Sequence, residues 1–355
     1  MPTNAAAQSA KSRRGCAGSG LRISGALLCL VLGSTGALKA HAQAPNPGVS
    51  AAPITLIVPS DETGSAGRIG RVVAEALARH LHASVRVRHL PGLSGVTGTN
   101  AIAAAAPDGA TLGLAFSTPM IGAKLLSRTA SYNPLQDFEW LALFGTYGYA
   151  LVVRADDPAR TFDEWLTRAR AAHTPLRYGS NGIASAAHIA GEYLRMQQHA
   201  NLAHTTFATS SQGYAALAAG DINALFDGTP SAIAAANARQ YRVLAVTSGT
   251  RDPLFAQTPA FGETFAGQHF ETWVGIVAPA GLKPAARERL VAGIGGLLAD
   301  AALRARLAEL GITWLGLSGP GADQFVRDDI VRKAQQIANV GIQSGDSPPR
   351  APSPP

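Results

Sequence analysis

The feature that constrains this chain most is the repeated alternation of short apolar strands with amphipathic helices. The run Ile54 to Val58 is apolar and β-branched, stops at Pro59, and is followed by apolar residues at helical spacing as far as Leu77. The same order of strand, loop and helix recurs at the expected strands Val85 to Val87 and Thr111 to Phe116. This alternation predicts an α/β fold, with a mixed or parallel sheet covered by helices.

A second set of alternating elements begins after Tyr147. Its first helix is marked by a capping box, in which Thr161 is followed three residues later by Glu164. The segment from Thr272 onward contains too few expected strands for a third unit, so we expect it to return to the first. The sequence therefore predicts two lobes joined by a hinge that the chain crosses twice. The predicted first lobe comprises residues 43–147 and 249–343, and the second comprises residues 148–248.

Residues 1–42 have the pattern of a secretory signal. They contain five basic and no acidic residues, an apolar run from Ile23 to Leu32, and the small-residue pattern Ala40-His41-Ala42. The apolar run is shorter than the roughly 20 residues that span a bilayer. We expect cleavage after Ala42 and a periplasmic mature chain, while the pair Arg13-Arg14 leaves the general and the twin-arginine export routes open. Both cysteines fall in this segment, so the mature chain is expected to have no disulfide.

Composition excludes several other classes of protein. Without the predicted signal the chain keeps 25 basic and 23 acidic residues and no Lys/Arg block, which argues against nucleic acid as a partner. The glycines at 64, 67 and 70 lack the close first pair of the dinucleotide motif, and no Walker A sequence occurs, so no cofactor is expected. Residues 344–355 are rich in Pro and Ser and are predicted to be a disordered tail.

The ends of the expected strands indicate a binding site. In such sheets ligands bind beyond the carboxyl ends of the strands, which places the loops 60–67, 90–98 and 117–118 on one rim. Glycine-rich loops there can offer backbone N–H groups at helix N-termini to an anion, or can simply make tight turns. On the second lobe, a loop begins at Ser180 and leads to a helix that carries His188. Asp227 follows an apolar strand, where it could bind a ligand hydroxyl or amine, or cap a helix.

Catalysis and metal binding find little support in the motifs. Ser185 and His188 could belong to a hydrolase, but no G-x-S-x-G nucleophile motif exists in the chain. The nine histidines include no H-E-x-x-H motif and no H-x-x-x-H pair within one expected helix. We therefore expect a protein that is not an enzyme and that holds no metal.

An ordered series of motifs, from about Ile54 to Ile342, resembles the substrate-binding proteins of tripartite tricarboxylate transporters, the Bug receptor family. The matching stretches are Val58-Pro59 with Gly64 and Arg71, Pro91-Gly92 with Gly95 and Gly98, Pro107-Asp108-Gly109 with Thr111-Leu112, Tyr132 to Phe138 (YNPLQDF), Tyr178 to His188 (YGSNGIASAAH), Gly220 to Asp227 (GDINALFD), Thr258-Pro259 and Trp273 to Gly281 (WVGIVAPAG). The resemblance implies a periplasmic binding protein fold of type II-like form that captures a small carboxylate by closing its lobes. It also implies a monomer that works with membrane transporter subunits.

The resemblance, together with the strand-end argument, gives a set of ligand-binding candidates. The candidates are Ser60, Thr63, Gly64, Ser65, Ala66, Arg68, Gly95, Ser117, Thr118, Ser180, Asn181, Gly182, Ser185, His188, Thr206, Phe207 and Asp227. Thr206 and Phe207 come from the resemblance alone. An alternative role is that of a sensor adaptor presenting the liganded form to a membrane kinase, and a Ser/His hydrolase is a further alternative.

The first loop departs from the family pattern. Where that pattern reads VPFPAGGxxD, this chain has Ser60, Asp61, Glu62 and Thr63 before Gly64, so an aromatic residue is lost and two acids enter. A ligand carboxylate beside two acids is repelled unless both side chains point away. We therefore hypothesise a zwitterionic ligand, or one with a cationic group, whose anionic end lies on the turn from Gly64 to Arg68.

Overall fold

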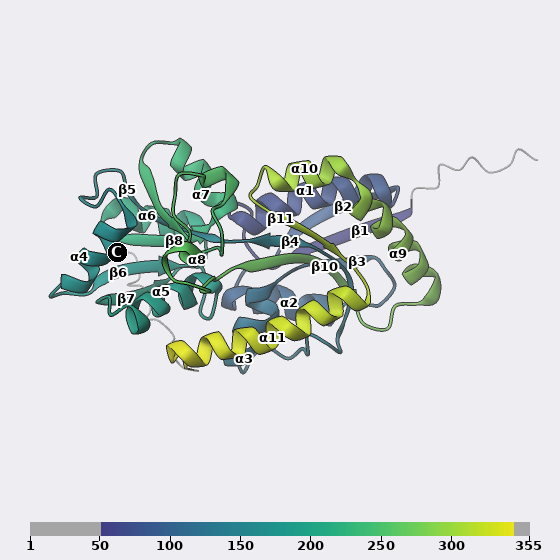
Figure 1. The fold of residues 1–355 in the computed structure, drawn as a ribbon. Coiled ribbons are helices and arrows are strands. Elements are labelled where there is room, and N and C mark those ends of the chain that lie inside the picture. Colours follow the sequence, from purple (N-terminus) through teal and green to yellow (C-terminus); the bar gives the residue numbers. More distant parts are fainter. Residues whose placement is uncertain (1–50, 344–355) are drawn as a thin grey trace, which may run out of the picture. The chain divides into compact units, whose positions relative to one another are not determined.

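The computed structural model describes residues 51–343, which form two mixed sheets flanked by helices (Figure 1). The sheet of the first lobe has the order β11-β4-β10-β3-β1-β2, and that of the second has the order β7-β6-β8-β5-β9. The strands of the first are β1 (Ala51–Val58), β2 (Ala83–His89), β3 (Thr111–Phe116), β4 (Phe138–Tyr147), β10 (Thr272–Pro279) and β11 (Thr313–Leu317). Those of the second are β5 (Tyr149–Arg154), β6 (Leu176–Ser180), β7 (Leu202–Thr206), β8 (Ala224–Gly228) and β9 (Tyr241–Val246). The predicted α/β fold with two lobes is confirmed. The predicted signal and tail lie outside the described residues.

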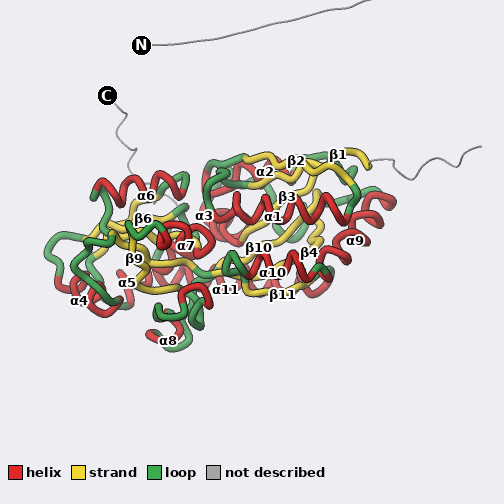
Figure 2. Tube along the Cα trace, turned by 90° about the horizontal axis from the view of Figure 1, so that it is seen from above, coloured by secondary structure: helices red, strands yellow, loops and turns green. Residues whose placement is uncertain are grey.

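Helices cover both sheets, as Figure 2 shows from above. Those of the first lobe are α1 (Ser65–His80), α2 (Val96–Ala103), α3 (Ala123–Leu126), α9 (Pro284–Ala299), α10 (Ala301–Ala308) and α11 (Pro320–Val340). Those of the second are α4 (Phe162–Ala171), α5 (Ala186–Gln197), α6 (Ser210–Ala219), α7 (Thr229–Asn237) and α8 (Phe261–Thr264). Short helical turns occur at Leu93–Gly95, Thr118–Gly122 and Pro253–Phe255. Within the described part of the chain, no helix has both the length and the apolar character needed to cross a bilayer.

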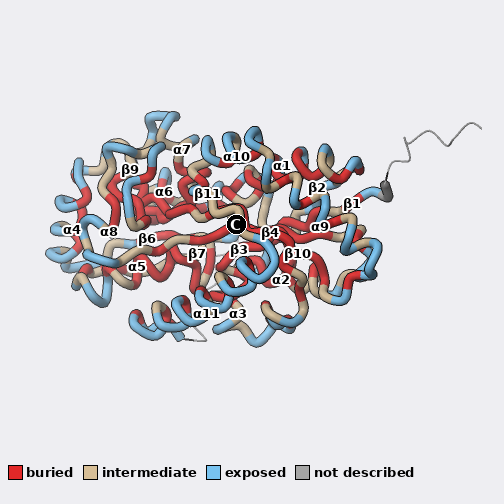
Figure 3. The backbone as a smooth tube through the Cα atoms, turned by 45° about the vertical axis from the view of Figure 1, so that its right-hand side comes forward, coloured by how far each residue is buried: buried red, intermediate tan, exposed pale blue. Residues whose placement is uncertain are grey.

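Parallel strands carry the loops that matter for binding. In the first lobe β1 pairs in parallel with β2 and β3, and in the second β6 pairs in parallel with β7 and β8. The buried apolar residues of these strands form the interior of each lobe, whereas α4 and α11 each show exposed residues on their outer faces (Figure 3). Because parallel strands end at the same edge of a sheet, the loops that follow them lie together.

The predicted capping box is confirmed, and three other expectations are corrected. The Thr161 hydroxyl accepts the backbone N–H of Glu164 at 3.2 Å, which starts α4. Strands β4 and β11 were not expected, and β11 has only five residues. Helix α2 begins at Val96, inside the expected loop 90–98, because Gly98 belongs to the helix. A Cβ on Gly98 would lie 2.7 Å from Pro59 Cα, so this glycine permits close packing inside a helix and does not mark a loop.

The hinge is made where the chain passes between the sheets. It leaves the first sheet at Gly148, between β4 and β5, and returns between β9 and β10, which pairs with both β3 and β4. Buried Thr247 joins the two crossings: its backbone N–H donates to Tyr149 O at 2.8 Å, and its carbonyl accepts the N–H of Phe270 at 2.8 Å. The C-terminal segment thus returns to the first sheet, where β10 and β11 both pair with β4.

Helix α11 contributes to the cores of both lobes. Ala322 and Val326 pack in a first-lobe cluster with Trp140 and Trp273. At its other end, Ile337 and Val340 pack in the second-lobe core, a contact that the sequence did not predict. Figure 1 shows the helix running beneath both groups of strands. The C-terminal helix therefore links the lobes on the side of the hinge.

Candidate functional site

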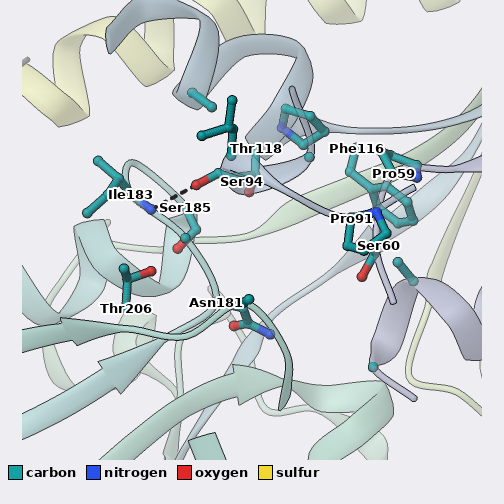
Figure 4. A pocket seen from close by; sticks show the side chains of 18 of the residues that line it. Pro59, Ser60, Pro91, Ser94, Phe116, Thr118, Asn181, Ile183, Ser185 and Thr206 are labelled. Atoms are coloured by element: carbon teal, nitrogen blue, oxygen red, sulfur yellow. Dashed lines mark hydrogen bonds between the residues drawn. The ribbon is translucent and has the colours of Figure 1, made fainter. Parts of the chain in front are cut away.

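A cavity of about 550 Å³ lies at the carboxyl ends of the parallel strands and is lined by residues of both lobes. Pro59 follows β1, Pro91 follows β2, and Thr118 closely follows β3. From the second lobe, Asn181 follows β6 and Phe207 follows β7. Figure 4 shows the side chains of the two lobes facing each other across this space. The cavity is in the position that strand topology gives to a ligand.

The structure brings most of the predicted site residues together at this cavity. Eleven of them line it: Ser60, Gly64, Ser65, Ala66, Gly95, Thr118, Asn181, Gly182, Ser185, Thr206 and Phe207. Six predicted residues are absent from the lining: Thr63, Arg68, Ser117, Ser180, His188 and Asp227. Ser180 and Asp227 are fully buried, and Ser117 and His188 nearly so. The roles of the eleven in ligand binding stay predictions.

Sequence reasoning missed several residues of the lining. Among them are Pro59, Phe116, Tyr147, Tyr149, Ile183, Ser210, Gly228, Thr272 and Gln343, whereas Asp61 and Ser94 lie in loops that the sequence had placed on the rim. Tyr147 and Tyr149 flank the hinge glycine, so an aromatic pair at an expected crossing between lobes was a usable signal. Gln343 lies just beyond α11, and no local pattern indicates that it reaches a cavity.

Helix N-termini surround the cavity. The first residue or the N-cap residue of five helices belongs to the lining, namely Ser65 of α1, Gly95 before α2, Ser185 before α5, Ser210 of α6 and Gly228 before α7. Each helix has at least eight residues, so each carries unsatisfied N–H groups and a positive dipole end at this point. Among the described lining residues there is no Lys, Arg or His. Backbone groups are therefore the source of positive partial charge in this lining.

Two tyrosines add hydroxyl groups to the lining. Burial raises the pKa of Tyr149 to about 12 and raises the pKa of Tyr147 well above its ordinary value. Both phenols are therefore protonated at neutral pH and able to donate hydrogen bonds.

Direct hydrogen bonds join the two lobes beside the cavity. The backbone N–H of Ile183 donates to Ser94 Oγ at 3.1 Å, a bond drawn in Figure 4. Buried Ser65 and Ser231 join their hydroxyls at 2.8 Å, also across the lobes. Ser94 has a φ of 55°, in the left-handed region that non-glycine residues seldom adopt. The loop 90–98 is thus held in a strained conformation that presents Ser94 to the opposite lobe.

Asp227 lies behind the lining rather than in it. It belongs to β8, where we had expected a position after the strand, and it is fully buried. Its Oδ1 accepts Ser210 Oγ at 2.8 Å and Asn181 Nδ2 at 3.0 Å. Burial raises the pKa of its carboxyl group above the ordinary value. Asp227 therefore holds two side chains that line the cavity.

The raised pKa of Asp227 predicts a pH-dependent stability. Between the unfolded and folded pKa values the folded protein keeps a proton that the unfolded chain releases, so the free energy of unfolding falls as pH rises through this window. Asp227→Asn has no such group and can keep both accepted hydrogen bonds. We expect its melting temperature to exceed that of the wild type at pH 8, with the difference shrinking towards pH 4.

The control for this prediction is Asp156→Asn, which makes the same change at an exposed carboxylate paired with Arg154. Melting curves recorded from pH 4 to 8 for the three proteins are the measurement. Parallel curves for the wild type and Asp227→Asn would contradict the prediction.

Two stacked histidines lie beneath the loop 180–185. The rings of His188 and His204 are 3.9 Å apart and nearly parallel, and His204 Nε2 lies 2.8 Å from Ser180 Oγ. Burial, and to a lesser extent the neighbouring His188, lowers the pKa of His204 to about 2. Ser180 is fully buried, so its hydroxyl is inaccessible to a substrate in the cavity. The Ser185 hydroxyl accepts the backbone N–H of His188 as a helix cap. Neither serine is thus arranged as an activated nucleophile.

Within residues 51–343, no group of three or more His, Cys, Asp or Glu side chains is placed to hold a metal ion.

The family model described as "Tripartite tricarboxylate transporter family receptor" matches residues 69–342. A relative from Pseudomonas sp. (strain P51), described as a UPF0065 protein in the tcbD-tcbE intergenic region, is 30% identical over 278 residues, which are 78% of this chain and 81% of the relative.

Two solved structures show the same fold. The periplasmic binding protein BugD aligns with a TM-score of 0.76 at 24% identity, over 82% of this chain and 98% of BugD. The R. palustris protein Rpa4515, solved with adipate, aligns with a TM-score of 0.78 at 23% identity, over 82% of this chain and 98% of that protein. The role that the family description names is that of a receptor, and the expectation of a binding protein rather than an enzyme is confirmed. The chain belongs to the tripartite tricarboxylate transporter receptor family.

Proposed function

We propose that this protein captures a small carboxylate-bearing solute in the periplasm and presents its closed, liganded form to the membrane subunits of a tripartite tricarboxylate-type transporter. The observation that carries the proposal is the convergence of five helix N-termini on a cavity whose described lining has no cationic side chain. A carboxylate there is bound by backbone N–H groups and dipoles, as anions are at helix N-termini. The adipate bound to the similar R. palustris protein is a ligand of this class.

The contacts between the lobes support capture by closure. Ser94 with Ile183 and Ser65 with Ser231 each join one residue of the first lobe to one of the second. A ligand that touches both lobes favours the state in which these bonds form, and a transporter can select that state. The periplasmic location is supported by the secretory pattern of residues 1–42 and by the description of BugD as periplasmic.

A thermal-shift screen of the purified protein tests the proposal. The panel contains mono-, di- and tricarboxylates, amino acids and nicotinate-like aromatic acids. The primary amide of each acid, which lacks the carboxylate charge, serves as its control. At a hundredfold excess over Kd a specific ligand adds about 2.7 kcal/mol of stability. We expect at least one acid to raise the melting temperature while its amide has no effect. Equal shifts for acids and amides, or none at all, would contradict carboxylate capture.

A further inference from the structure

The lining of the cavity contains one acidic side chain. Asp61 is the lone residue with a charged side chain among those described residues that line the cavity. Its neighbour Glu62 is not part of the lining; the Glu62 side chain is 72% exposed and lies 3.8 Å from Arg71. Of the two acids that the sequence places in the first loop, Asp61 alone contributes its charge directly to the site.

The Asp61 carboxylate occupies donors that a ligand anion would otherwise use. Its Oδ1 accepts the backbone N–H of Thr63 at 2.8 Å, the Thr63 hydroxyl at 2.6 Å and the backbone N–H of Gly64 at 3.1 Å. These groups lie just before α1 begins. The hypothesis that a ligand's anionic end lies on the turn from Gly64 to Arg68 is thereby weakened, since Arg68 is also absent from the lining.

Asn181, which lines the same cavity, has an acceptor atom that is not satisfied. Its Nδ2 donates to Asp227 Oδ1 at 3.0 Å and to Ser210 Oγ at 3.3 Å. The Ser210 hydroxyl gives its own proton to Asp227, so it accepts from Asn181, and the orientation of the amide is fixed. The Asn181 Oδ1 atom is left buried with no hydrogen-bond partner in the described part of the chain. A buried acceptor of this kind requires a donor.

Asp61 and Ser210, the hydrogen-bond partner of Asn181, lie on the same side of the cavity. A Cβ on Gly64 would stand 3.6 Å from Asp61 Oδ2 and 3.3 Å from Ser210 Oγ, so both atoms flank this point. Ser210 in turn contacts Asn181 at 3.3 Å. This corner, formed by Asp61 of the first lobe with Asn181 and Ser210 of the second, is complete in the closed form.

We propose that the ligand carries an ammonium group beside its carboxylate, with the ammonium bound at the corner of Asp61 and Asn181 and the carboxylate at the remaining helix N-termini. The inference rests on the proposed capture of a carboxylate. An ammonium group has three N–H donors and a positive charge, which suits a carboxylate and an amide oxygen together. A second ligand carboxylate at this corner would face Asp61 and find acceptors instead of donors.

Pairs of acids that differ by one amino group test this inference: succinate with aspartate, glutarate with glutamate, and butyrate with 4-aminobutyrate. Calorimetric titration gives Kd for the wild type, Asp61→Asn and Glu62→Gln. The side-chain amide oxygen in Asp61→Asn can still accept the N–H groups of Thr63 and Gly64, so this variant removes the charge and keeps the loop. Glu62→Gln removes an equal charge at the exposed neighbour and is the matched control.

We expect the wild type to bind at least one amino-bearing acid about tenfold or more tightly than its partner, a difference of about 1.4 kcal/mol. Asp61→Asn should abolish most of that preference, and Glu62→Gln should leave it within about twofold. The ratio of the Kd values of the plain and the amino-bearing acid, measured on the wild type, tests the inference even if Asp61→Asn does not fold. Plain acids that bind as tightly as their amino partners would overturn the inference and leave carboxylate capture intact. Binding of no acid, in these pairs or in the wider panel, would overturn both.

Discussion

Gly122→Ala is expected to weaken ligand binding about 100-fold, or by about 2.7 kcal/mol, without destabilising either lobe. A Cβ on Gly122 would lie 2.3 Å from the carbonyl oxygen of Ala184, which belongs to the loop of the opposite lobe. The φ of Gly122 is −57°, an ordinary helical value, so alanine is compatible with the local backbone. The three atoms nearest to the added methyl group all belong to Ala184, so the substitution obstructs the approach of the lobes. Titration with the carboxylate that most stabilises the wild type measures the effect.

The matched control is Gly295→Ala in α9, where an added Cβ would meet no atom within 4 Å. This variant should bind like the wild type, and its stability should stay equal or rise by up to about 1 kcal/mol, because alanine favours a helix over glycine. Small-angle scattering gives a readout that is independent of affinity, since Gly122→Ala should keep a larger radius of gyration in the presence of ligand. A compact Gly122→Ala variant with wild-type affinity would show that the contact between Gly122 and Ala184 is not part of the liganded state.

The fold could be predicted because its signals are local. Strand β1 is a continuous apolar run that ends at a proline, and α4 begins at a capping box that involves only Thr161 and Glu164. The missed strand β11 depends on a partner far along the chain, since it pairs antiparallel with β4 about 170 residues earlier. Its side chains are only partly buried, so its sequence has no strong alternation. Such a strand is stabilised by its neighbour more than by its own residues.

The candidate site was predictable where it follows strand ends and not where it depends on the closure of the lobes. Asn181 and Thr118 lie directly after β6 and near the end of β3, so the topology alone places them at the cavity. Ser94 is different, because its role is a hydrogen bond to Ile183 in the other lobe. Asp227 was expected on the rim, but the strand continues through it as far as Gly228 and buries it. Two residues of extra strand length are within the uncertainty of a strand end read from a sequence pattern.

Asp61 and Glu62 illustrate the same difference. The sequence places two adjacent acids in the first loop, where they repel a ligand carboxylate unless both side chains point away. In the structure the two side chains point in different directions. Glu62 is exposed near Arg71, whereas Asp61 accepts a hydrogen bond from its own loop at the edge of the cavity. The donors before α1 determine this outcome, because they attract whichever carboxylate can reach them. The charge that remains in the site therefore belongs to one residue and can be tested by one substitution.

Asp329→Leu is expected to lower the free energy of unfolding by about 3 to 5 kcal/mol, the range found when one partner of a buried charge cluster is removed. Asp329 is 2% exposed and accepts the indole N–H of Trp273 at 2.7 Å and the guanidinium of Arg332 at 2.7 Å. Lys333, also 2% exposed, lies beside it and donates to the carbonyl of Glu271 at 3.3 Å. The cluster attaches α11 to the start of β10, where the chain returns from the second lobe. Urea denaturation gives the measurement.

The double variant Asp329→Leu/Lys333→Met separates the charge from the packing. If the uncompensated Lys333 ammonium causes most of the loss, the double variant should recover about half of it, because an apolar side chain of similar length is better tolerated in that position.

The pH dependence gives a second test. Burial lowers the pKa of Lys333 below its ordinary 10.5, so in that window the unfolded chain binds more protons and stability rises with pH. Asp329→Leu should show this rise most strongly, and the double variant should lack it. If the double variant is as unstable as Asp329→Leu at every pH, the loss of stability comes from the missing hydrogen bonds to Trp273 and Arg332. The unpaired charge of Lys333 then has no measurable part in it.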